Sequence, residues 1–292
     1  MSRINEWMKN FSAPDLGKIR DVDRAQLLRY IMLVVAAGVV LFPIFIMITT
    51  SLKTRTQTFS MPPVWIFEPT LKHYHEVLFS GNFLKYLVNS LIVATSTAFF
   101  SILVGAFAAY ALVRFEFLGK RAVSTVTLLL RMIPPAVLIV PLFVLWLNIG
   151  LSGSRMGLIF AYIALNLSFT IWILRSFMNE IPVEIEESAV IDGCSELGIL
   201  FRIVLPLIKP GLAVASIFVF RISWNEFILA LVLTDRTTRT LPVAISLRIT
   251  QVGVQWGEIT AMATIVALPA FIFTFLSARS IIRGLTAGAV KG

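Results

Sequence analysis

Five charged side chains lie close together in residues 186–206, a stretch whose neighbours are almost entirely apolar. They are Glu186, Glu187, Asp192, Glu196 and Arg202. Carboxylates suit the first turns of helices, where the helix dipole favours negative charge. Glu186 and Glu187 fall in such turns, together with Glu184.

The same stretch carries the start and stop signals of two short helices. Pro182 can begin the first helix, since its missing N–H would be unpaired there. Gly193 can end that helix by adopting a left-handed conformation, and Ser195 can cap the next one. Leu197, Leu200, Phe201 and Val204 then follow at helical spacing and predict one apolar stripe.

Two helices of this length are too short to be stable alone and too polar to cross a membrane. They need a surface to pack on, which the ends of membrane spans or another protein could supply. The alternative is a solvated loop whose acids only satisfy helix ends.

Three charged residues, Arg131, Arg221 and Glu226, fall well inside predicted membrane spans, and Asn225 lies beside Glu226 in the fifth. A charge in hydrocarbon costs at least ~2.5 kcal/mol, so these side chains should face protein or water. Arg221 and Asn225 share a helix face at i, i+4, whereas Glu226 points elsewhere. They could line a path for a hydroxyl-rich solute, or they could bond neighbouring helices of this chain or of a partner subunit.

No other motif predicts catalysis or cofactor binding. His73, His75 and Glu76 lie close together, but no further ligand completes a metal site. The nearest approach to a phosphate-binding loop is Gly119-Lys120-Arg121, which lacks the upstream glycine and the hydroxyl residue. We therefore expect no enzyme activity and no cofactor in this chain.

The composition predicts an integral membrane protein. The 292 residues are 58% hydrophobic and 14% charged, against about 25% charged in soluble domains. The net charge of +9 does not indicate nucleic-acid binding, because the basic residues lie at the ends of apolar runs. Cys194 is the single cysteine, which excludes an internal disulfide.

Six apolar runs predict an all-α protein with six transmembrane helices. They are Tyr30–Thr50, Leu87–Leu112, Val123–Asn148, Gly157–Met178, Gly211–Leu233 and Ile259–Ala278. The shortest has 20 residues, which at about 1.5 Å per residue crosses ~30 Å of hydrocarbon. Pro134, Pro135 and Pro141 should kink the third span.

Lysine and arginine predict the orientation. If both termini are cytoplasmic, the inner segments hold nearly twice as many basic residues as the outer ones. Residues 1–29 then form a cytoplasmic N-terminal segment, and 30–292 form one membrane domain. A cytoplasmic loop, 179–210, connects the fourth and fifth spans, while 51–86 and 234–258 are long outer loops.

The charged loop resembles the signature loop of binding-protein-dependent ABC importer permeases. That pattern is Glu-Ala-Ala, three residues, Gly, nine residues, Ile, one residue, Leu-Pro. Here Glu187-Ser188-Ala189 precedes Gly193, and Ile203-Val204-Leu205-Pro206 follows in register. Ser188 in place of the first alanine is the one departure. The stretches 62–74, 85–94, 131–143, 223–234 and 284–292 also resemble the second permease of maltose-type sugar importers.

The resemblance implies a type I ABC importer transmembrane domain in the bacterial inner membrane. Its loop would couple this chain to an ATPase through Glu187, Ser188, Ala189, Asp192, Gly193, Ile203, Leu205 and Pro206. Implied partners are a second homologous permease, two ATP-binding subunits that hold ATP and Mg²⁺, an extracytoplasmic solute-binding protein and membrane lipid. The implied solute is a carbohydrate or polyol.

Two other classes of membrane protein predict different sequence features. An ion-coupled secondary carrier should show inverted repeats and intramembrane acids, of which Glu226 is the one example. A membrane enzyme should show clustered histidines, acids or an activated nucleophile near one membrane face. The sequence favours the ABC importer permease.

Overall fold

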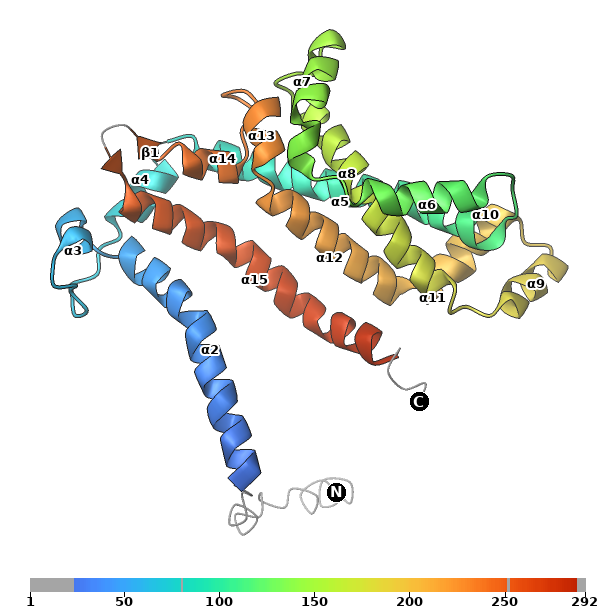
Figure 1. The fold of residues 1–292 in the computed structure, drawn as a ribbon, viewed down its shortest axis with the longest axis horizontal. Coiled ribbons are helices and arrows are strands. Elements are labelled where there is room, and N and C mark those ends of the chain that lie inside the picture. The colour runs from blue at the N-terminus through green and yellow to red at the C-terminus, as the bar shows by residue number, and fades with distance from the viewer. Residues whose placement is uncertain (1–23, 80, 251–252, 288–292) are drawn as a thin grey trace, which may run out of the picture. The chain divides into compact units, whose positions relative to one another are not determined.

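The chain is helical throughout most of its length in a computed structural model, which describes residues 24–79, 81–250 and 253–287 (Figure 1). The contacts divide the chain into two units, Met1–Thr49 and Thr50–Gly292. Helix α2 (Arg24–Ser51) covers the first predicted span, and all of it except its last two residues is the described part of the first unit. Residues 1–23, most of the predicted segment 1–29, lie outside the described residues.

The second unit holds the remaining helices and one small hairpin (Figure 1). In chain order its elements are α3 (Arg55–Phe59), α4 (Lys72–Phe79), α5 (Phe83–Arg114), α6 (Lys120–Leu130), η2 (Pro135–Leu138), α7 (Ile139–Asn148), α8 (Arg155–Met178), α9 (Val183–Ile191), α10 (Glu196–Ile199), η3 (Leu200–Val204), α11 (Leu205–Leu207), α12 (Lys209–Asn225), α13 (Ile228–Leu233), α14 (Leu241–Ser246), β1 (Ile249–Thr250), β2 (Gly253–Val254) and α15 (Trp256–Ala287).

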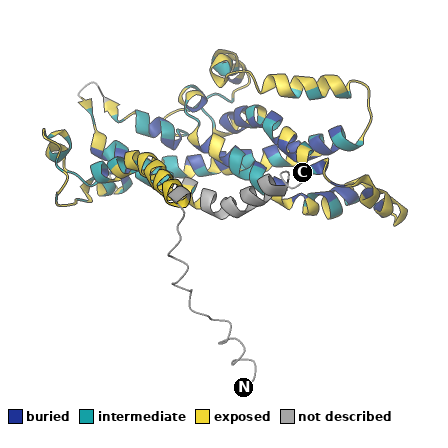
Figure 2. Ribbon diagram, turned by 60° about the horizontal axis from the view of Figure 1, so that its bottom comes forward, coloured by how far each residue is buried: buried dark blue, intermediate teal, exposed yellow. Residues whose placement is uncertain are grey.

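Helix α5 is the centre of this unit and packs along both α8 and α12. Buried residues gather where these helices meet, while the outward faces stay exposed (Figure 2). Gly105 lets α5 and α8 approach closely, because a Cβ there would lie 2.6 Å from Thr170 Cγ2. Small residues at such contacts are typical of helix packing within membranes.

The described residues include three helices that are long and apolar enough to cross a membrane, or five if each bent pair is one span. The three are α2, α5 and α8. The all-helical, polytopic prediction is therefore confirmed. The sixth predicted run lies within α15, which spans Trp256–Ala287.

The third predicted span, Val123–Asn148, is not one helix. Helix α6 ends at Leu130, and the following segment, Pro135–Asn148, turns from it by 99°. Pro134 and Pro135 cannot continue the helix, so the predicted kink is a break. The prediction was wrong for Pro141, which lies in the first turn of α7, where no intrahelical N–H bond is lost.

The fifth predicted span, Gly211–Leu233, was also wrong as one continuous helix. Helix α12 ends at Asn225 and α13 begins at Ile228. Neither Pro nor Gly stands at this break. The Glu226 carboxylate accepts from the backbone N–H groups of Leu229 at 2.9 Å and Ala230 at 3.1 Å, which stabilises a new helix start.

Side chains of α5 hold the segment after α13 in place. Asn89 donates from Nδ2 to the carbonyls of Thr237 and Arg239, both at 3.0 Å. The Ser90 hydroxyl accepts from the Leu241 N–H at 2.8 Å. Within the turn, hydrogen bonds from the Thr237 hydroxyl and backbone N–H lower the pKa of Asp235. The connection from α13 to α14 is thus a folded turn.

We predict that Gly105→Ala destabilises the α5–α8 contact by about 1–3 kcal/mol, because the added methyl group overpacks against Thr170. Thermal unfolding of the purified assembly should show a lower Tm. Adding Thr170→Ser, which removes the opposing methyl group and keeps the hydroxyl, should restore much of the loss. A double variant no more stable than Gly105→Ala would show that this contact is not the cause.

Candidate functional site: the anchored α9–α10 loop

The loop after α8 folds into the two short helices that the sequence predicts. Pro182 is the residue before α9, and Glu184 and Glu186 lie in its first turn. Gly193 adopts φ +81° directly after the helix. The Cys194 N–H donates to the Ala189 carbonyl at 2.9 Å, and the Gly193 N–H donates to the Val190 carbonyl at 3.0 Å. This is a Schellman motif, which needs a left-handed residue at Gly193.

Ser195 starts the second helix as expected. Its hydroxyl accepts from the Gly198 N–H at 3.2 Å and caps α10. The chain then continues through η3 and α11 and turns by 80° into α12. The helix pair therefore leads directly into a core helix of the second unit.

A buried ion pair ties α9 to the end of α5. Arg114 Nη2 lies 2.6 Å from Glu186 Oε1, and Arg114 Nε donates to the same oxygen at 2.7 Å. The two side chains are only 13% and 8% exposed. A buried charge that loses its partner is strongly destabilising, so each of these residues requires the other.

The same arginine also binds the turn between α8 and α9. Its Nη2 donates to the carbonyls of Met178 at 3.2 Å and Ile181 at 3.1 Å. A guanidinium at this place satisfies carbonyls that the end of α8 leaves unpaired. One side chain thus joins α5, the end of α8 and α9.

Tyr110 extends this polar anchor toward α10. Its hydroxyl lies 3.1 Å from Glu186 Oε2 and 3.4 Å from Glu196 Oε2. Because the hydroxyl carries one hydrogen, it donates to only one of the two carboxylates at a time. The sequence indicates only that Glu186 is one of the charges in the first helical turns of the loop and that Arg114 is one of the basic residues at the ends of apolar runs. An arginine at the end of an apolar run is too common a signal to predict this pairing.

The underside of the loop packs on the main core. Ala189, Ile199, Leu200 and Val204 are buried against residues of α5 and α8. The predicted apolar stripe is only half correct, because Leu197 and Phe201 are 60% and 49% exposed. Leu200 and Val204 are buried as predicted, and Ile199, the residue before the π-helical turn η3, is buried as well.

The opposite face of the loop, turned away from α5 and α8 and called its upper face below, is exposed in this chain; exposed residues are yellow in Figure 2. Of the predicted coupling residues, Glu187, Ser188, Asp192, Gly193 and Pro206 are exposed. Ile191 is 87% exposed and Val190 is 55% exposed. Ala189 is buried, while Ile203 and Leu205 pack partly against the same core. Exposed apolar groups beside acids are typical of a protein-binding surface.

The four predicted path residues fall into two groups. Arg131 lies at the end of α6 with its guanidinium 4.9 Å from the Phe169 ring centroid and 5.2 Å from that of Trp172. Arg221 lies 5.8 Å from the Phe218 ring, and Phe169 and Phe218 contact each other at 5.6 Å. We call these five residues the arginine–aromatic cluster. It joins α6, α8 and α12.

Asn225 and Glu226 make bonds within the fold instead. Asn225 Nδ2 donates to the Arg221 carbonyl at 2.8 Å. Besides capping α13, Glu226 accepts from the Tyr162 hydroxyl at 2.5 Å. Among the described residues no group of three possible metal ligands occurs, and His73 and Glu76 form only a pair at 3.7 Å.

Long apolar helices, broken spans and an anchored polar loop together define a polytopic transport-type membrane domain. Residues 101–286 match the family described as "Binding-protein-dependent transport system inner membrane component". The chain therefore belongs to the binding-protein-dependent ABC transporter permeases.

Individual relatives agree with this assignment. The chain is 37% identical to the "Probable ABC transporter permease protein y4oR" of Sinorhizobium fredii, over 88% of this chain and 92% of that protein. It is 35% identical to the "Trehalose/maltose transport system permease protein MalG" of Thermococcus litoralis, over 92% and 99%. The fold is similar to a bacterial alginate importer structure at TM-score 0.73 and 20% identity, covering 89% of this chain and 98% of that chain.

The protein is a non-catalytic, multi-pass subunit of the inner membrane and acts in an importer complex with a binding protein and ATPases. ATP is bound by the partner subunits. The ion-coupled carrier, the alternative class, is excluded by this family membership.

We predict that Glu186→Gln and Arg114→Gln each destabilise the assembly by about 3–5 kcal/mol, because each leaves a buried charge without its partner. Glu187→Gln is the matched control, since this neighbouring acid is exposed. Thermal unfolding of the purified assemblies should rank both buried variants well below the control. Equal Tm values for Glu186→Gln and Glu187→Gln would contradict the anchoring role.

Proposed function

We propose that this permease subunit imports a carbohydrate or polyol and is coupled to its ATPase through residues 182–206. The anchored loop supports this coupling most directly. Its underside is fixed to α5 and α8 by Arg114 and Glu186, while its upper face is open to a partner.

The fixed underside would make the loop an effective transmitter of movement. Arg114 binds α9 and the α8 end together, so a displacement of α9 moves the ends of α5 and α8 with it. Packed cores respond to such a displacement as rigid bodies rather than by gradual deformation. This supports alternating access, in which ATP acts through its stronger binding to one arrangement of the subunits.

The open face has the chemistry of a docking surface. Ile191 and Val190 offer apolar contact, and Glu187 and Asp192 offer charge at its edge. Glu187 would face a basic group of the ATPase. Gly193 turns the chain sharply between α9 and α10, which keeps the tip narrow enough for a cleft.

The proposed orientation places this loop and both chain ends in the cytoplasm. The distribution of lysine and arginine supports it. Segments 51–86 and 234–258 are then the outer loops, and α3, α4 and α14 lie at the end of the second unit opposite α9 (Figure 1). Residues 30–292 act as one transport domain.

The arginine–aromatic cluster is our candidate for the solute path. Aromatic faces stack on the apolar faces of sugar rings, and guanidinium groups donate to hydroxyls. Arg131, Arg221 and Trp172 are exposed in this chain although they lie among apolar helices. The break between α6 and α7 begins at Arg131, so this residue would move when the span bends. The relative MalG is named for trehalose and maltose transport, which also favours a sugar.

We predict that the double variant Glu187→Arg with Ile191→Ser lowers ATP hydrolysis stimulated by the binding protein at least tenfold. The changes reverse a charge and remove apolar contact on the exposed face, so the fold should be retained. The control is Glu68→Arg, which changes an exposed acid in the predicted outer loop 51–86. Normal stimulation and normal co-purification of the ATPases with the double variant would refute the coupling assignment.

We also predict that Arg131→Gln and Arg221→Gln raise the KM of uptake several-fold while ATPase subunits still co-purify. The guanidinium donors would be lost from the path, whereas the coupling loop is unchanged. Arg155→Gln, at the exposed start of α8, is the matched control. If these variants instead release the second permease with an unchanged KM, the two arginines bond the subunits together.

A further inference from the structure

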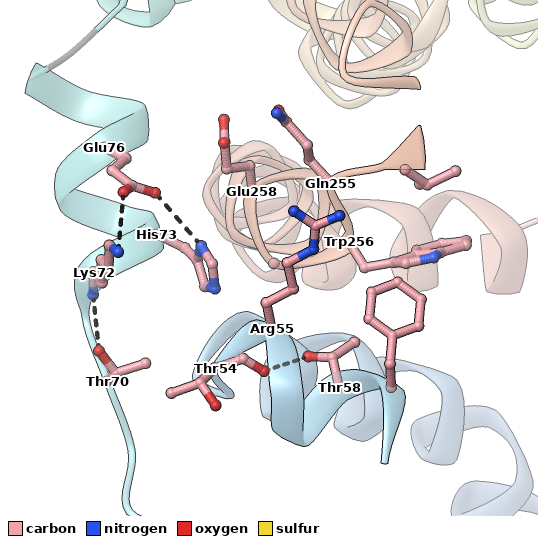
Figure 3. Close-up of a pocket in the computed structure, with 13 residues that line it drawn as sticks. Thr54, Arg55, Thr58, Thr70, Lys72, His73, Glu76, Gln255, Trp256 and Glu258 are labelled. Atoms are coloured by element: carbon pink, nitrogen blue, oxygen red, sulfur yellow. Dashed lines mark hydrogen bonds and ion pairs between the residues drawn. The ribbon is translucent and has the colours of Figure 1, made fainter. Parts of the chain in front are cut away.

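A pocket of about 320 Å³ lies at the end of the second unit opposite the α9–α10 loop (Figure 3). Three segments far apart in the chain form it: residues 54–59, 70–76 and 254–258. Its volume falls at the low end of the ~300–1,000 Å³ typical of small-molecule sites. In the proposed orientation it opens to the outer side, where the solute arrives.

Three side chains at this pocket carry polar groups that are free to bind a ligand. Figure 3 shows the Arg55 side chain rising from α3 between His73 and Trp256, with Gln255 and Glu258 nearby. Within the described part of the chain, the Arg55 guanidinium, the Gln255 amide and the Trp256 indole N–H have no hydrogen-bond or ion-pair partner. Trp256 is 46% exposed, so its ring is available for stacking.

The other polar groups of the pocket are held in place by the fold. Glu258 pairs with Arg248 at 2.7 Å, which orients its carboxylate. His73 Nε2 lies 3.1 Å from the Lys53 carbonyl, so its ring position is fixed. A Cβ at Gly257 would clash with the His73 ring, so only glycine lets the start of α15 approach α4 this closely. Pre-positioned groups of this kind lower the cost of binding.

The charges at the pocket nearly balance. Arg55 and Lys72 are cationic, and Glu76 and Glu258 are anionic. Lys72 lies 3.8 Å from Glu76 and Arg248 pairs with Glu258, so no strong field of one sign remains. A balanced set of donors and acceptors matches hydroxyl groups, which both donate and accept. An indole face beside such groups suits the apolar face of a sugar ring.

We infer that this pocket is a carbohydrate-binding subsite on the permease itself, with Trp256 as the stacking surface and Arg55 and Gln255 as hydrogen-bonding groups. This inference rests on the proposed import of a carbohydrate or polyol. It places a first contact for the solute on the outer loops, before the arginine–aromatic cluster. The segment 234–258 thereby contributes to the solute route through its last residues.

The test uses the full importer complex in lipid nanodiscs without the binding protein and without nucleotide. Maltose, trehalose, diacetylchitobiose and glycerol serve as probes, with binding measured by saturation-transfer NMR and titration calorimetry. We expect at least one probe to bind, and Trp256→Ala and Arg55→Gln each to weaken that binding at least tenfold. The matched controls are Trp65→Ala and Arg236→Gln, exposed outer residues beyond the pocket lining. They should change affinity less than twofold.

Absence of binding by all four probes would overturn the inference, as would equal binding by the pocket variants and controls. A third contrary result is weaker docking of the binding protein in Trp256→Ala without any direct sugar binding, since the pocket would then receive a protein side chain. Basal ATP hydrolysis and Tm confirm that the variants are folded. Failure here leaves the Glu187 coupling test unaffected, so the two proposals fail separately.

Discussion

The ion pair between Arg114 and Glu186 is the interaction on which the functional end of this protein depends. It is buried, it joins two segments 72 residues apart, and its arginine also satisfies carbonyls at the end of α8. Without it, α9 would be a short polar helix with little reason to fold. With it, a charged segment is fixed to the ends of α5 and α8, as the proposed coupling to an ATPase requires.

The broken helices are a second feature on which the membrane domain depends, because their ends need hydrogen-bond partners. The chain departs from helical geometry between α6 and α7 and between α12 and α13. Backbone groups freed inside a membrane must find partners within the protein. Glu226 supplies them for α13, and Tyr162 binds the same carboxylate. The break before α13 is therefore stabilised within the fold, and Glu226 beside it need not contact the solute.

The two ends of the second unit, for which we propose different binding roles, hold similar residues in different surroundings. At the α9–α10 end, an arginine is buried on a carboxylate and the surface left open is apolar and acidic. At the opposite end, Arg55 is open while the carboxylates around it are paired or held near cations. Burial decides which role each arginine has, because a buried guanidinium must have its partner within the protein.

Most helix positions and the α9–α10 turn could be predicted from the sequence, because their causes are local. Runs of twenty apolar residues must become helices in lipid, and the Gly193 and Ser195 signals act within a few residues. The pairing of Arg114 with Glu186, the bond from Tyr162 to Glu226 and the meeting of Arg131 with Phe169 could not be predicted in this way. Each contact joins residues that lie far apart in the sequence, and no local motif links them. Only helix packing brings them within bonding distance, so the tertiary structure decided which polar residues anchor the fold and which remain free to bind.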